Sequence, residues 1–91
     1  MPFFSQDFLE SLSDKADIVD VISDYVTLKN SGRSYVGLCP FHREKTPSFH
    51  VDADKQLFHC FGCQASGNVY TFIMKIENLD FVEAVKFLAN R

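Results

Sequence analysis

Four side chains that bind metals well occur as two close pairs near the middle of this 91-residue chain. Cys39 and His42 form a C-x2-H pair, and Cys60 and Cys63 form a C-x2-C pair, with seventeen residues between them. That interval is long enough for one β-hairpin, which would place both pairs at the ends of neighbouring strands. Zn²⁺ prefers thiolate and imidazole ligands, and three cysteines with one histidine are a common closed set. The spacing therefore predicts one structural zinc ion.

Other interpretations of these residues remain open at this point. They could be incidental residues around a core, Cys60 and Cys63 could form a redox pair, or a catalytic zinc could carry water as its fourth ligand. An odd number of cysteines, three, argues against a closed disulfide framework and favours a reducing compartment. Two further histidines are interpreted as surface residues, His50 in mid-strand and His59 on the sheet face opposite Cys60, with a nucleic-acid contact as the alternative for His59.

Hydrophobic periodicity predicts an α+β fold, a small antiparallel sheet flanked by N- and C-terminal helices. We expect helical segments at 8–12, 18–25, 69–76 and 81–88. The expected cap residues are Ser5, Ser13 or Asp14, Asn68, and Asp80 in a capping box with Glu83. The expected strands are 26–29 and 34–38 around the turn Asn30-Ser31-Gly32, then 48–51 and 56–60. The whole chain is expected to be one domain, 1–91, with a zinc module at about 27–67.

The charge is unevenly distributed, because residues 1–26 carry a net −5 whereas residues 27–59 carry a net +2. Basic and aromatic side chains alternate along the expected strands, at Lys29, Arg33, Tyr35, Lys45, Lys55, Phe58 and His59. Cations that follow phosphates and rings that stack on unpaired bases suit a single-stranded nucleic acid. On these residues alone the signal is modest, and Phe58 could equally belong to the core.

Several strings of residues closely resemble the N-terminal zinc-binding domain of bacterial DNA primases of the DnaG type. They are Asp17-Ile18-Val19-Asp20-Val21-Ile22, the run from Cys39 to Phe49 that reads CPFHREKTPSF, Phe58-His59-Cys60-Phe61-Gly62-Cys63, and Phe81-Val82-Glu83-Ala84. The likeness extends over nearly all of the chain, and the ligand pattern shows no departure from the family.

The resemblance implies a zinc-ribbon-like sheet that engages a single-stranded DNA template and helps to select where an RNA primer starts. It assigns the zinc to Cys39, His42, Cys60 and Cys63. It implies that primer synthesis, with Mg²⁺, belongs to a catalytic domain absent from this chain, and that a C-terminal domain, also absent, binds the replicative helicase. The zinc domain would act on the catalytic domain of its own chain or of a neighbour, in the bacterial cytoplasm. The sequence shows no membrane-spanning stretch.

Two rival functions follow from the same sequence. A protein-interaction module would use the acidic first helix with Phe3 and Phe4, and would bind partners without DNA affinity. A self-sufficient zinc enzyme would need an open metal position, visible as a labile water ligand after cobalt substitution. The template-binding hypothesis instead expects salt-sensitive binding to single strands, weakened by Lys45→Ala or Lys55→Ala.

Overall fold

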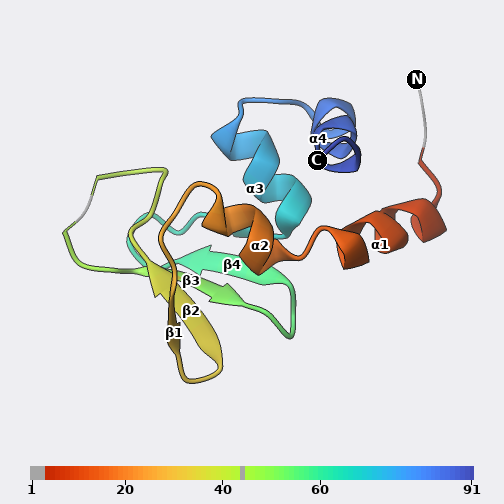
Figure 1. The fold of residues 1–91 in the computed structure, drawn as a ribbon. Coiled ribbons are helices and arrows are strands. Elements are labelled where there is room, and N and C mark those ends of the chain that lie inside the picture. Colours follow the sequence, from red (N-terminus) through yellow and green to blue (C-terminus); the bar gives the residue numbers. More distant parts are fainter. Residues whose placement is uncertain (1–3, 44) are drawn as a thin grey trace.

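The computed structural model describes residues 4–43 and 45–91; Phe3 and Glu44, which belong to segments discussed above, lie outside them. Figure 1 shows helices gathered on one side of a small sheet. The elements are α1 (Gln6–Lys15), α2 (Ile18–Ser23), β1 (Lys29–Ser31), β2 (Ser34–Gly37), β3 (Phe49–Asp52), β4 (Leu57–Cys60), β5 (Ser66–Gly67), α3 (Val69–Ile76) and α4 (Phe81–Ala89). The predicted α+β class with an antiparallel sheet is confirmed.

The five strands lie in the sheet in the same order as in the sequence, β1-β2-β3-β4-β5, and every neighbouring pair is antiparallel. Both expected hairpins are present. The first strand starts at Lys29 rather than at Val26, because Val26 is buried against the core at the end of the α2 connection. The two-residue strand β5 was not predicted, since so short a segment has no detectable alternation.

The core lies between the sheet and the helices that cover one of its faces (Figure 1). Phe49 and Phe58 from β3 and β4 are in ring contact with each other and with Phe72 of α3, at centroid distances of 5.5–6.2 Å. All three rings are almost completely buried. Burying such aromatic side chains is worth about 1.5–3 kcal/mol each. Phe58 is therefore a core residue and does not belong to a nucleic-acid surface.

Side chains fix the starts of the helices largely as expected. Ser5, Asn68 and Asp80 are the N-caps of α1, α3 and α4, and Asp80 forms the predicted capping box. The expectation for α2 was wrong, because its cap is Asp17, whose carboxylate accepts from the backbone N–H groups of Val19 and Asp20. Ser13 and Asp14, the expected caps, instead lie within the last turns of α1.

A glutamine far along the chain completes the start of α2. Gln56, in the turn between β3 and β4, accepts from the backbone N–H of Ile18 at 2.9 Å and donates to Asp17 at 2.8 Å. Its amide also donates to the carbonyl of Ala53. The first turn of α2 is thereby attached to the sheet. No helix in the described part of the chain is long and apolar enough to cross a membrane.

Candidate metal centre and nucleic-acid interface

The fold brings the two predicted ligand pairs together at one end of the sheet. The ligand atoms of Cys39, His42, Cys60 and Cys63 all lie within 4.8 Å of one another. Cys39 follows β2 after one intervening residue, and Cys60 is the last residue of β4. Cys39 and Cys60 are buried whereas Cys63 is exposed, so the cluster opens to solvent on one side.

The distances within this cluster suit a tetrahedral zinc ion. Zn–S bonds of about 2.3 Å and Zn–N bonds of about 2.0–2.1 Å place neighbouring ligand atoms about 3.5–3.8 Å apart. The sulfur atoms of Cys39 and Cys63 are 3.7 Å apart, and Nε2 of His42 is 3.3 Å from the sulfur of Cys60. Four protein ligands complete a tetrahedron and leave no position for water, which suits a structural ion.

The two ligand pairs are held differently. Each contains one phenylalanine, and these two rings point in different directions. Phe41, between Cys39 and His42, packs on the core rings Phe49, Phe58 and Phe72 at 5.6–6.2 Å. Its backbone N–H also donates to the sulfur of Cys39. The first pair is therefore anchored by the core. Phe61, in the second pair, is 61% exposed and lies on the outside.

Gly62 is required by the ligand geometry and not by a special backbone angle. A Cβ atom on this residue would lie 2.8–2.9 Å from the His42 ring and 3.0 Å from Oγ of Ser48. The missing side chain of this glycine makes room for the ligand imidazole. Nδ1 of His42 lies 3.2 Å from the carbonyl oxygen of Arg43, a contact that orients the ring when Nδ1 carries the proton.

Hydrogen-bond donors prepare the Cys60 sulfur for a metal. Burial raises the pKa of this thiol, but donation from Ser48, the backbone of Cys63, His42 and the backbone of Gly62 together lowers it to about 6. The hydroxyl of Ser48 lies 3.5 Å from the sulfur. The side chain is thus inclined toward the thiolate form, which is the form that binds zinc.

The pKa of the Cys39 thiol is shifted in the opposite direction when no cation is bound. Burial, together with the neighbouring thiols of Cys60 and Cys63, raises the pKa of its thiol to about 12 against the lowering effect of the Phe41 N–H. Three sulfurs this close cannot all ionise unless a positive charge sits between them. A bound dication supplies that charge, so the donor set and its electrostatics both fit zinc.

Comparison with known proteins decides the family. A model of the CHC2 zinc finger matches residues 4–91. The chain belongs to the CHC2 zinc finger family. Among its curated relatives, a DNA primase of Clostridium acetobutylicum is 56% identical over 96% of this chain and 15% of that protein. A DNA primase of Geobacillus stearothermophilus is 60% identical over 92% of this chain and 14% of that protein.

A solved structure agrees with this assignment. The Aquifex aeolicus primase, comprising zinc-binding and RNA polymerase domains, superposes on 97% of this zinc finger with a TM-score of 0.87 and 43% identity. The matched part is 22% of that solved chain. The CHC2 zinc finger described here thus spans about a seventh of the length of the curated relatives.

The face of the sheet that the helices leave uncovered carries a row of side chains across all five strands, polar except for one valine on β2. Lys29 pairs with Val36, Val36 with His50, His50 with His59, and His59 with Ser66. Directly paired residues on antiparallel strands point to the same face. We call this row with Phe61 the outer face. Two of the predicted nucleic-acid residues, Lys29 and His59, belong to it.

Phe61 and His50 are members of the outer face that the sequence interpretation did not assign to it. The Phe61 ring meets His59 edge-on at 4.5 Å and His50 at 4.9 Å. These three rings, with Leu57 and Lys55 nearby, line a cavity of about 470 Å³. The signal was present in the sequence, because strand alternation places His50 and His59 together on the face opposite Phe49 and Cys60.

The other predicted contact residues are more scattered. Tyr35 pairs with Val51, which is buried, so its ring lies on the helix-covered face and packs against the core. Arg33 and Lys55 lie in the exposed turns after β1 and β3, and Lys45 lies in the exposed loop that follows the first ligand pair. Tyr35 and Phe58 are therefore turned toward the core, whereas Arg33, Lys45 and Lys55 are exposed.

Proposed function

We propose that this zinc finger binds single-stranded DNA through its outer face and, as part of a DNA primase, helps to select where RNA primers begin. The names of the relatives support the primase assignment. Primer synthesis would belong to the RNA polymerase domain, whose Mg²⁺-dependent chemistry needs residues outside this chain. The four zinc ligands would be Cys39, His42, Cys60 and Cys63, with the ion holding the outer face in shape.

One observation carries the proposal: aromatic rings and basic side chains lie together on the outer face. Phe61 is the most exposed large apolar side chain of the described residues, and two imidazole rings support it from the side. A ring that stays exposed beside histidines offers a stacking surface for an unpaired base, while Lys29 and Lys55 attract phosphates. A duplex keeps its bases stacked inside and offers nothing to such a ring.

The remaining partners follow from the primase assignment. The catalytic domain would meet this zinc finger in the same chain or in a neighbouring one, and the replicative helicase would bind a separate C-terminal domain. The assembly would work at the replication fork in the bacterial cytoplasm. A flat face that binds the template would suit presentation of that strand to a catalytic domain.

Fluorescence anisotropy with a labelled single strand tests the proposal, using the zinc-loaded chain at low salt. Phe61→Ala should weaken binding about 5- to 150-fold, because one base–aromatic stack is worth about 1–3 kcal/mol. Lys55→Ala should weaken binding and reduce its dependence on salt, since it removes one phosphate contact. Lys45→Ala is expected to weaken binding as well.

Phe87→Ala is the matched control, because Phe87 is an exposed phenylalanine on α4, an element that contributes nothing to the outer face. Its binding should equal that of the unaltered chain. Equal losses for Phe61→Ala and Phe87→Ala, or preference for a duplex over the single strand, would overturn the proposed function.

A further inference from the structure

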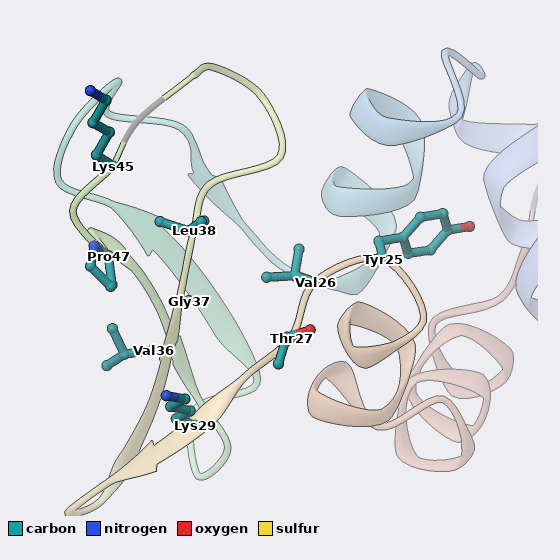
Figure 2. Close-up of a pocket in the computed structure, with 9 residues that line it drawn as sticks. All are labelled: Tyr25, Val26, Thr27, Lys29, Val36, Gly37, Leu38, Lys45 and Pro47. Atoms are coloured by element: carbon teal, nitrogen blue, oxygen red, sulfur yellow. The ribbon is translucent and has the colours of Figure 1, made fainter.

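A second hollow lies beside the outer face and has a different chemical character. It has a volume of about 450 Å³ and is bounded by β1, β2, the α2–β1 connection and the loop after the first ligand pair. Figure 2 shows Lys29 and Lys45 at its opposite ends, with Val36, Leu38 and Pro47 between them. We call this hollow the lysine pocket. Its volume falls within the range of small-molecule sites.

Among the described residues that line the lysine pocket, the two charged side chains, Lys29 and Lys45, are both positive. No acidic residue lines it among the described residues, and neither Lys29 nor Lys45 has an ion-pair partner in residues 4–43 and 45–91. The only ion pair in that part of the chain joins Arg91 to Asp24, outside the pocket. Two lysines at opposite ends of the hollow, each without an ion-pair partner among the described residues, would attract an anion at each end.

The middle of the lysine pocket is apolar. Leu38 is 48% exposed although it is a large aliphatic residue, and Val36 and Pro47 lie alongside it. The ring of Tyr25 points away toward the helices, where its hydroxyl donates to Glu77 at 2.7 Å, so it does not fill the space. An apolar strip between two cations suits a flat apolar group that carries a phosphate on either side.

We propose that the lysine pocket receives one nucleotide, with its base against Val36, Leu38 and Pro47 and flanking phosphates at Lys29 and Lys45. The inference rests on the proposed function and extends it from general stacking to a discrete base-binding subsite. Register supports continuity, because Lys29 and Val36 belong to the same row as His50 and His59. A single strand lying along that row leads from Phe61 to the pocket.

The nucleotide could belong to a strand or be free, and NMR separates these sources. Spectra of the zinc-loaded chain are recorded with each deoxynucleoside 5′-monophosphate, with inorganic phosphate, and with a 12-nucleotide single strand. Shifts of the Val36 and Leu38 methyl signals with the strand support the pocket, whether or not the monophosphates also cause them. Equal shifts with inorganic phosphate alone would overturn it, because they would show a phosphate site without a base.

A scan of abasic positions along that strand provides the decisive measurement and needs no protein variant. A base that enters the pocket makes two positions sensitive: one for the base on Phe61 and a second whose loss weakens binding about 5- to 150-fold. Leu38→Trp, which fills the pocket from a residue outside the outer face and keeps both lysines, should abolish the second sensitivity and leave the first. Zinc content and circular dichroism confirm that the variant is folded.

The outcomes distinguish the two proposals. If binding is sensitive only at the abasic position that faces Phe61, or if every position causes a similar small loss of affinity, the lysine pocket is not a base site. Template binding is not contradicted by either result. Absence of binding to every strand overturns the proposed function itself. A second sensitive position that persists in Leu38→Trp would also contradict the pocket.

Discussion

At the scale of single residues, the metal centre depends on side chains that are absent or small as much as on the four ligands. Gly62 gives the His42 ring its space, and Ser48 gives the Cys60 sulfur a donor. Neither residue binds the metal, yet Gly62 affects the position of one ligand and Ser48 the protonation of another. Groups of this kind commonly change metal affinity about 10- to 100-fold.

Gly62→Ala is expected to lower zinc affinity about 10- to 100-fold, because the new methyl group would collide with the rigid His42 ring. Competition with a coloured zinc chelator measures the change. Gly32→Ala is the control: its φ of +66° makes the substitution strained, but a Cβ there meets nothing within 4 Å. An affinity that is the same in both variants would contradict the steric role of Gly62.

Ser48→Ala should shift zinc loss to higher pH. The pKa of Cys60 is lowered in the folded chain from 9.0 to about 6, so the stability contributed by its thiolate is present above pH 9 and is lost as the pH falls toward 6. Without the Ser48 hydroxyl this pKa rises and protons displace zinc earlier. The measurement is zinc release during an acid titration.

Ser34→Ala serves as the reference for that titration, since among the described residues the Ser34 hydroxyl hydrogen-bonds only to the carbonyl of Ser31, at 3.4 Å, in the β1–β2 hairpin. Its release curve should coincide with that of the unaltered chain. A Ser48→Ala curve that also coincides would show that the hydroxyl has no effect on the sulfur.

At the scale of elements, the sequence predicted those features that depend on near neighbours. Caps at Ser5, Asn68 and Asp80 satisfy N–H groups two or three residues away, so the local pattern reveals them. The cap of α2 is just as local, but it was misplaced because Ser13 and Asp14 are equally suitable cap residues nearby; only the hydrogen bond from Gln56 to Asp17, across thirty-nine residues, is long-range. No local pattern contains such a partnership.

The same difference between local and long-range determinants explains which residues of the outer face the sequence predicted. Strand alternation is enough to place His59 opposite Cys60, but the face of Tyr35 depends on its register with Val51, and register is set by the whole sheet. The exposure of Phe61 was not predicted, because the C-x2-H and the C-x2-C pair each contain one phenylalanine and the sequence does not distinguish the two. Only the packing shows that Phe41 points inward and Phe61 outward.

Gln56→Ala is expected to lower the free energy of unfolding by about 1–3 kcal/mol, since it leaves the Ile18 N–H without its acceptor and frees the start of α2 from the β3–β4 turn. Urea denaturation of the zinc-loaded chain measures the effect. Gln6→Ala removes a glutamine whose amide contacts only Glu10 on the exposed side of α1, and should change stability by less than about 0.5 kcal/mol.

A small loss of stability in Gln56→Ala, equal to that of Gln6→Ala, would mean that water replaces the glutamine without cost. Hydrogen exchange at the Ile18 amide gives an independent reading, because loss of the acceptor should expose that amide before the rest of α2 opens.

At the scale of the whole molecule, zinc joins two segments that the strands alone would hold loosely. The connection from Leu38 to Ser48 contains no helix or strand among its described residues, and the first ligand pair is its link to the second. Zinc binding in small domains contributes about 10–16 kcal/mol of apparent folding free energy at neutral pH. That is comparable with the entire stability of a domain of this size.

Chelation, or Cys60→Ser, should therefore unfold the sheet. Circular dichroism and dispersion of the NMR spectrum measure the change, and added zinc should restore the chelated but not the substituted protein. Retention of an unchanged spectrum by the metal-free chain would contradict a structural role for the ion. The control is Leu57→Ala, an exposed strand residue near the site that should respond to chelation like the unaltered chain.

The strand order described above, in which spatial and chain order coincide, also bears on how the protein is made. On a ribosome each new strand would emerge beside the strand synthesised just before it, so no exposed edge has to wait for a distant partner. The second pair of metal ligands leaves the ribosome only after β1 to β4 have been produced. Ion capture would then follow the first pairing of β1 to β4 and stabilise strands that have already met, before β5 is added.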